Sequence, residues 1–347
     1  MRCSRKRAAR TEKNLEIKRL RRRPLQQTMR RSLLLITLVI VLAAGLTGCL
    51  SGAPDGGDTD GGGDTDPMND TEDGNETDGS EASYDQEEHM GCQPGEINKN
   101  GTCTVAFSGA NAEIFSAQNL TPITTSNTSL GGTPGYLARP ADDGEYPAVI
   151  MIHEWWGLND NIRHMADVLA GQGYTVFAVD LYDGEVARES SRAQELSSQV
   201  RNNPNEAVTK LSLATEALRD SRYTTGEVAS LGWCFGGGWS LQLSLSDTEL
   251  DGTVIYYGTL TTNATELRSI DEPVLGIFGS EDQVVGRENV RDFNRTLDEI
   301  GIENEIHLYD GAGHAFANPS GESFRPEATR DAWNRTLSFL DETLKSE

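Results

Sequence analysis

The sequence contains few cysteines, few histidines and few basic residues. There are 5 cysteines and 5 histidines among 347 residues, and 30 Lys and Arg stand against 54 Asp and Glu. Residues 1–48 hold 13 of the basic residues but only 2 of the acidic ones, so the remainder carries 17 basic and 52 acidic residues. A surface with that charge repels polyanions, and we therefore expect no nucleic-acid partner.

Carboxylates continue through the region that we expect to fold, while lysines are scarce. This composition resembles the salt-adapted surfaces of proteins from extreme halophiles, and we prefer that interpretation to an acidic interaction surface. We expect the isolated protein to lose its fold at low salt, because its carboxylates repel one another. Full stability in dilute buffer would contradict this expectation.

The N-terminal region lacks an apolar run long enough for an ordinary transmembrane span. Its basic residues end at Arg30-Arg31, and about 16 apolar residues follow, where a span needs about 20. The run closes with Leu46-Thr47-Gly48-Cys49, which resembles the cleavage site of a lipoprotein signal. We prefer this reading of residues 1–48 to an uncleaved transmembrane helix. It predicts export, for which the Arg30-Arg31 pair also suits the twin-arginine route, and a lipid anchor on Cys49 at the outer face of the cell membrane.

Residues 49–90 consist mainly of Gly, Asp, Thr, Glu and Ser and have almost nothing to bury. We expect a disordered acidic tether that repels itself and holds the folded part away from the membrane. Cys92 and Cys103 follow. Because an exported domain meets oxidising conditions, we assign these two cysteines to a local disulfide in a lead-in of residues 91–130. A metal site is less favoured, since no histidine lies nearby to complete a ligand set.

Residues 131–347 alternate between strand-like and helix-like segments. Continuous apolar runs such as Ala148–Ile152 and Val274–Phe278 predict strands that are buried on both faces. Apolar residues at helical spacing predict helices between them, one of which Asn159 can cap. Short strands within 104–145 predict an antiparallel edge. The pattern indicates an α/β fold with a mainly parallel sheet, helices on both faces and active residues at the carboxyl ends of the strands.

Cys234 lies on a turn between a strand-like run that ends at Leu231 and a helix-like segment at 239–245. Gly232 and Gly236 flank it two residues away on either side, which is the spacing of a nucleophile elbow with cysteine in place of serine. Glycine is needed at both flanks because a Cβ there would collide with the neighbouring strand or helix. The alternative is a structural cysteine at a tight turn.

An acid and a histidine follow Cys234 in the chain order of an α/β-hydrolase triad. Asp282 and His314 each come just after a predicted strand. We expect His314 to act as the base for the thiol, whose unperturbed pKa is about 8.5, and Asp282 to accept a hydrogen bond from the imidazole. Glu281 competes for the second role. An exposed loop position is the alternative for the histidine.

Five motifs in order resemble the dienelactone hydrolases, the carboxymethylenebutenolidase-like branch of the α/β-hydrolase superfamily. They are His153-Glu154-Trp155-Trp156-Gly157, Asp180-Leu181-Tyr182, Gly232-Trp233-Cys234-Phe235-Gly236-Gly237, Gly279-Ser280-Glu281-Asp282 and Gly311-Ala312-Gly313-His314-Ala315-Phe316. The resemblance implies an α/β-hydrolase fold. It also implies hydrolysis of a small ester or lactone by thiolate attack through an acyl-enzyme, without a metal or an organic cofactor.

The resemblance implies further site residues. The glutamate that matches Glu154 takes part in activating the thiol, and a solvated loop carboxylate is the alternative here. The backbone N–H groups of Phe235 and Trp155 would form the oxyanion hole. Aromatic side chains are expected to form apolar pocket walls, although core packing explains each of them almost as well. These are Trp155, Trp156, Trp233 and Phe316.

The chain departs from the family at two arginines that bind the carboxylate of the substrate. Asn318 stands four residues after His314, and Asp183-Gly184 follow the Asp-Leu-Tyr segment, where the family has arginines. Arg188 and Arg325 are candidates to replace them. The reaction type therefore transfers better than the dienelactone substrate does.

These features predict a membrane-tethered hydrolase, monomeric, whose partner is a small ester or lactone. A non-catalytic surface lipoprotein that binds a small molecule in the same cleft is the main alternative. A thiol redox role is a third possibility, and the lack of a second cysteine near Cys234 disfavours it.

Overall fold

The computed structural model describes residues 96–105, 110–117 and 120–345. The predicted leader and tether, with Cys49, and the predicted disulfide partner Cys92 lie outside these ranges. Within the described ranges, no helix has both the length and the apolar character that crossing a membrane requires.

Ten strands of the described residues form one sheet, in the order β10-β9-β8-β7-β5-β6-β4-β3-β1-β2. The strands are β1 (Glu96–Lys99), β2 (Thr102–Val105), β3 (Ile123–Leu130), β4 (Thr133–Pro140), β5 (Tyr146–Ile152), β6 (Thr175–Val179), β7 (Thr224–Trp233), β8 (Gly252–Tyr256), β9 (Val274–Gly279) and β10 (Asn304–Tyr309). From β10 to β6 every neighbouring pair is parallel. Strand β4 pairs antiparallel with β6 and with β3. The predicted α/β fold with a mainly parallel sheet and an antiparallel edge is thus confirmed.

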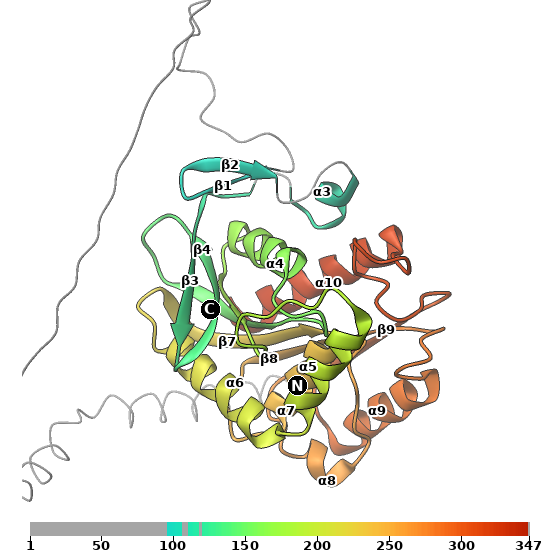
Figure 1. Cartoon of the computed structure of the whole chain (residues 1–347). Helices are drawn as coiled ribbons and strands as arrows, with labels where there is room; N and C mark the ends of the chain where they lie inside the picture. Colours follow the sequence, from blue (N-terminus) through green and yellow to red (C-terminus); the bar gives the residue numbers. More distant parts are fainter. Residues whose placement is uncertain (1–95, 106–109, 118–119, 346–347) are drawn as a thin grey trace, which may run out of the picture. The chain divides into compact units, whose positions relative to one another are not determined.

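Helices cover both faces of the sheet because alternate side chains of each strand point to opposite sides. On β5, Val149 and Met151 join the core cluster that contains α4 and α10, whereas Ile150 and Ile152 join the cluster of α6 and α7. Figure 1 shows α4 and α10 on one side and α6, α7 and α9 on the other. The helices are α3 (Ala110–Ile114), α4 (Asp160–Gly171), α5 (Ser190–Arg201), α6 (Pro204–Arg219), α7 (Phe235–Ser244), α8 (Ala264–Leu267), α9 (Arg287–Ile300) and α10 (Pro326–Leu344).

The lead-in shares the sheet of the domain that follows it. Strands β3 and β4 form a hairpin paired over eight positions, and the boundary predicted between residues 130 and 131 falls in its turn. Lys99 on β1 also contacts the domain, because its Nζ lies 2.9 Å from the buried carboxylate of Asp167 on α4. Cys103 on β2 is disulfide-bonded. Its pairing with Cys92 stays a prediction, since Cys92 lies outside the described residues.

Candidate active site

Cys234 forms the turn between β7 and α7, with φ 55° and ψ −112°. A left-handed φ is strained for a side chain with a Cβ and is found mainly at functional sites. The glycines around it are required by close packing. A Cβ on Gly232 would lie 2.1 Å from the carbonyl oxygen of Gly236, and a Cβ on Gly236 would lie 2.2 Å from that of Ile152. The helix begins at Phe235, four residues before the predicted segment, so Gly236 lies inside its first turn.

Three side chains from separate loops meet at this turn. His314, in the loop after β10, has its Nε2 3.1 Å from Cys234 Sγ and its Nδ1 2.9 Å from Asp282 Oδ2. Because a carboxylate only accepts hydrogen bonds, Nδ1–H donates to Asp282, and Nε2 is left to exchange a proton with the sulfur. The structure therefore joins the predicted nucleophile, base and acid in one line of hydrogen bonds.

Asp282 is buried, and its charge is held by several donors. Its Oδ1 accepts hydrogen bonds from the backbone N–H groups of Val284 and Val285, at 2.7 and 3.1 Å. Burial raises the pKa of Asp282, but the hydrogen bond and charge of His314 and the two amides outweigh it, so the net pKa is lowered. Glu281, the competing acid, is exposed.

His314 is partly exposed and sits between two groups that favour its charged form. Burial lowers its pKa, but the hydrogen bonds and charges of Asp282 and Cys234 raise the pKa to about 10. Both neighbours therefore favour the imidazolium form of His314.

Glu154 is the second residue after β5 and is buried, not a solvated loop carboxylate. Its Oε2 accepts a hydrogen bond of 2.7 Å from Nδ2 of Asn318, 164 residues further along the chain. Burial raises the pKa of Glu154 to about 7, against smaller lowering effects of the His314 charge and the Asn318 bond. Among the described residues its hydrogen-bond partner is thus Asn318, not the thiol of Cys234.

The two amides expected to form an oxyanion hole belong to a tight turn and to a helix start. The carbonyl of Glu154 accepts from the N–H of Gly157 at 3.1 Å, which places Trp155 at the second position of a turn. Phe235 is the first residue of α7, so its N–H has no acceptor within the helix.

His153 fixes this turn against α7. The backbone N–H of Leu181 donates to its Nε2 at 3.2 Å, so its Nδ1 carries the proton and donates to the carbonyl of Glu154 at 2.6 Å. The ring stacks on that of Phe235, with 5.6 Å between centroids. Burial lowers the pKa of His153, so the ring is neutral and positions the loop without adding charge.

A small pocket of about 10 Å³ lies beside Glu154. Its lining residues are Glu154, Asn161, Ile162, Met165, Trp233, Tyr257, Ala317 and Asn318. Of the four residues predicted as pocket walls, Trp233 lines this pocket and Phe316 is fully buried in the core. Trp156 is partly buried, and its ring lies 4.9 Å from that of Trp155.

Neither Tyr257 nor the bond from Asn318 to Glu154 was predicted from the sequence. Tyr257 is the last residue of the strand predicted over Gly252–Tyr257, and a position at such a strand end is a signal that could have found it. The bond of Asn318 has no such local signal. Arg188 and Arg325, the candidates to replace the family's arginines, are both exposed, and neither lines the small pocket.

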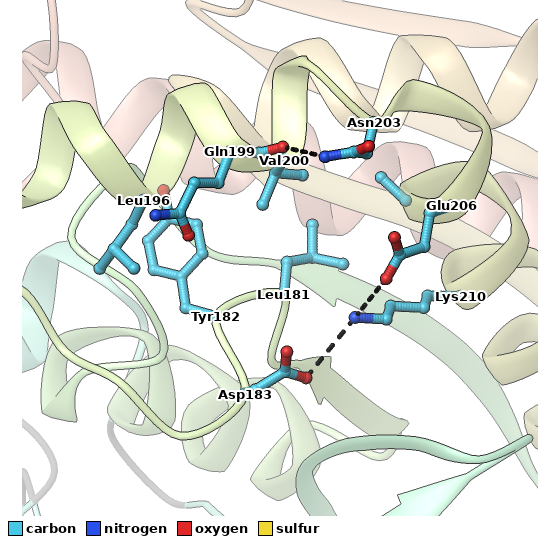
Figure 2. A pocket seen from close by; sticks show the side chains of 10 residues that line it. Leu181, Tyr182, Asp183, Leu196, Gln199, Val200, Asn203, Glu206 and Lys210 are labelled. Atoms are coloured by element: carbon cyan, nitrogen blue, oxygen red, sulfur yellow. Dashed lines mark hydrogen bonds and ion pairs between the residues drawn. The ribbon is translucent and has the colours of Figure 1, made fainter.

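A second cavity, of about 220 Å³, lies between α5, α6 and the loop after β6. Figure 2 shows Lys210 between the carboxylates of Asp183 and Glu206, with Nζ–O distances of 3.5 and 3.2 Å. None of the three hydrogen-bonded side chains at the Cys234 turn lines this cavity, so that hydrogen-bond line, not cavity size, locates the candidate site. In the part of the chain that the structure describes, no three His, Cys, Asp or Glu side chains gather as a metal site would require.

Comparisons with known proteins find a matching family and similar folds. Residues 133–344 match the model of the dienelactone hydrolase family. Protein usf of Aquifex pyrophilus is 32% identical over 217 residues, which cover 60% of this chain and 93% of that protein. A carboxymethylenebutenolidase-like protein of Saccharolobus solfataricus is 30% identical over 245 residues, with 60% of this chain and 94% of its own covered. The crystal structure of a dienelactone hydrolase-like protein of Klebsiella pneumoniae shares the fold, with 24% identity, a TM-score of 0.57 and coverage of 64% and 100%.

Proposed function

This chain belongs to the dienelactone hydrolase family and is an ester or lactone hydrolase, and from that premise we propose that Cys234, His314 and Asp282 perform the reaction on a small ester or lactone. The observation that carries the proposal is the line of hydrogen bonds from Cys234 Sγ to His314 Nε2, 3.1 Å, and from His314 Nδ1 to Asp282 Oδ2, 2.9 Å. A nucleophile within hydrogen-bond reach of a base, which a third group orients, is the arrangement that covalent catalysis needs.

In the proposed reaction, His314 takes the proton of the thiol and the thiolate attacks the carbonyl carbon. The oxyanion that forms is stabilised by the N–H groups of Phe235 and Trp155. His314 then gives its proton to the leaving alcohol, which leaves an acyl-enzyme on Cys234. Water, deprotonated by His314, attacks that thioester and releases the acid together with the thiol. Asp282 keeps the proton on Nδ1 throughout and stabilises the imidazolium.

Glu154 is proposed to take part in activating the thiol. Its pKa of about 7 means that both of its protonation states are populated near neutral pH. A carboxyl that is neutral in one state and charged in the other can change the stability of the nearby imidazolium and thiolate. The charge of His314 in turn lowers the pKa of Glu154, so the two groups are coupled.

The experiment that tests the proposal measures turnover of a panel of small esters and lactones at high salt, with wild type, Cys234→Ala and Cys234→Ser. We expect Cys234→Ala to lower kcat/KM by at least about a thousand-fold, because no nucleophile remains. The serine variant keeps the shape and controls for folding, which circular dichroism checks for all three proteins. Equal turnover by wild type and Cys234→Ala would refute the triad. Binding without turnover by wild type would favour the alternative, a non-catalytic lipoprotein.

We also propose that the protein is exported and tethered to the outer face of the cell membrane by a lipid on Cys49. The order of basic residues, short apolar run and Leu-Thr-Gly-Cys supports this. Wild type should partition into the membrane fraction of expressing cells, and Cys49→Ala should leave it. The same distribution for both proteins would refute the anchor.

A further inference from the structure

Tyr257, directly after β8, has a buried hydroxyl group without a hydrogen-bond partner. Its side chain is 1% exposed, and three buried side-chain polar atoms in the described part of the chain lack a partner: Gln172 Oε1, Trp333 Nε1 and Tyr257 Oη. Tyr257 is the one of the three that lines the pocket beside Glu154. An unpaired buried hydroxyl destabilises a folded protein, so its presence at a reaction centre calls for a functional reason.

The backbone of Tyr257 is strained as well. Its φ is 36°, a left-handed value for a residue with a large side chain. The neighbouring strand holds it there, since the N–H of Tyr257 donates to the carbonyl of Ile277 at 2.8 Å. Its ring packs edge-on against the rings of His314 and Phe316, with centroid distances of 5.3 and 5.8 Å. Strain and an unpaired donor at one residue beside the candidate base indicate a position kept for function, not for stability.

The pocket that Tyr257 lines has the size and polarity of a site for one oxygen. Its volume of about 10 Å³ is close to the space that one water-sized group needs. Tyr257 lines this pocket and has a hydroxyl donor without a partner, and Glu154 has a carboxyl group that can accept. No basic side chain is among the described residues that line the pocket, and Asn318 occupies the place where the resemblance expects an arginine.

We propose that the hydroxyl of Tyr257 donates a hydrogen bond to a substrate oxygen other than the reacting carbonyl, and that the substrate is an uncharged ester or lactone bearing a hydroxyl group. A hydroxyl can accept from Tyr257 and donate to Glu154 at the same time, whereas a substrate carboxylate would face the charge of Glu154 with no basic side chain among the residues that line the pocket. This inference rests on the proposed hydrolase function and names the substrate class of the same site.

Tyr257 remains a donor at any working pH. Burial raises its pKa well above the ordinary value for tyrosine, and the charges of Glu154, Cys234, Tyr256 and Asp282 raise it further. The phenol therefore keeps its proton while the groups around it titrate.

The first test separates a functional from a structural role with two adjacent tyrosines. Tyr256 is equally buried, but its hydroxyl is paired with Thr336 Oγ1 at 2.6 Å. We expect Tyr257→Phe to melt at the same or a higher temperature than wild type while its kcat/KM for a hydroxylactone falls about 3- to 10-fold, the effect of one neutral hydrogen bond. Tyr256→Phe should melt about 2–4 °C lower with kcat/KM unchanged. A lower melting temperature of Tyr257→Phe with unchanged kinetics would overturn the inference.

The second test compares isosteric lactones, in which a methyl group replaces a hydroxyl: α-hydroxy- against α-methyl-γ-butyrolactone, and the corresponding β-substituted pair. For each pair we compare the kcat/KM of the hydroxyl compound with that of the methyl compound. In at least one pair, this ratio should be about 3- to 10-fold higher for wild type than for Tyr257→Phe. γ-Butyrolactone-γ-carboxylate should be the poorest substrate. Equal ratios in wild type and variant, or a preference for the carboxylate, would overturn the inference while leaving the hydrolase function intact. Failure of wild type on every ester and lactone would instead refute the function itself.

Discussion

The loops after β5 and β9 each place a buried carboxylate beside His314, yet the two carboxylates have opposite pKa shifts. Glu154 is 3% exposed and Asp282 is 2% exposed. Burial raises the pKa of Glu154 to about 7, whereas the pKa of Asp282 is lowered overall although burial alone would raise it. The two carboxylates also differ in their donors. Asp282 accepts hydrogen bonds from two backbone N–H groups and from His314, and Glu154 accepts one from Asn318.

The comparison teaches that a buried carboxyl here keeps its charge where several donors outweigh burial, as at Asp282, and loses its charge more readily where burial outweighs a single donor, as at Glu154. One environment keeps Asp282 ionised, as a group that orients an imidazolium must be. The other lets Glu154 change its protonation near neutral pH. Two carboxyl groups whose pKa values are driven apart are a common sign of divided acid and base roles. Their effects on stability also have opposite signs. Asp282 stabilises the fold, and this contribution is lost as the pH falls below the ordinary pKa of an aspartate. Glu154 destabilises the fold as the pH rises above the ordinary pKa of a glutamate.

The largest effect should come from removing the charge of the Asp282 carboxylate. Asp282→Asn keeps the shape but presents an amide that can no longer hold the proton on His314 Nδ1. We expect kcat/KM to fall by a factor on the order of 10³ to 10⁴. Glu281→Gln is the matched control, because its exposed neighbouring carboxylate should be dispensable. Steady-state kinetics on one ester measures both variants. Equal losses in the two variants would mean that the site responds to local charge and not to the bond with His314.

The role and the position of Asp282 could be predicted from the sequence. Asp282 follows the end of a predicted strand and accepts from the N–H groups two and three residues later, which is the local pattern of an Asx turn. The elbow at Cys234 could likewise be predicted, because the spacing of its glycines is a local pattern, although the close contact that requires Gly236 is with Ile152 on β5. Helix α9 was missed although Val290, Phe293 and Leu297 recur at helical spacing and are buried.

The surroundings of Glu154 depend on contacts that no local sequence pattern encodes. From the sequence, Asn318 stood out only because the family has an arginine at this position. Its hydrogen bond to Glu154 joins two loops that are 164 residues apart in the chain. That Tyr257 lacks a partner follows from how β8, β9 and the loop around Phe316 pack together. The sequence shows which residue types are present at a strand end, but burial and pairing of a polar group are properties of the assembled core.

The variant Glu154→Gln tests the raised pKa of Glu154 through its effect on the stability of the protein. With a folded-state pKa of about 7 against an ordinary 4.5, Glu154 ionises first in the unfolded chain as the pH rises. Ionisation of Glu154 should therefore cost wild type on the order of 3 kcal/mol of unfolding free energy between pH 4.5 and 7, and this contribution should not grow above pH 7. Because Gln does not titrate, the difference between wild type and variant isolates this loss. Urea unfolding at constant high salt measures it, and a difference that is independent of pH would contradict the buried, weakly paired carboxyl.

The smallest effect should come from Asn318→Ala, which removes the side chain that donates a hydrogen bond to Glu154. This variant separates the effect of the donor on the pKa of Glu154 from the effect of burial. A hydrogen bond to an ionised carboxylate favours the charged form, so its loss should raise the pKa of Glu154 by about one unit. The pH window over which stability falls would then extend to a higher pH than in wild type. The difference in unfolding free energy between Asn318→Ala and the double variant Asn318→Ala/Glu154→Gln gives the midpoint of that window. Asn161→Ala is the control, because Asn161 lines the same pocket and has no hydrogen bond to the carboxylate among the described contacts. An unchanged midpoint in Asn318→Ala would show that burial alone sets the charge of Glu154, and that donors decide only at Asp282.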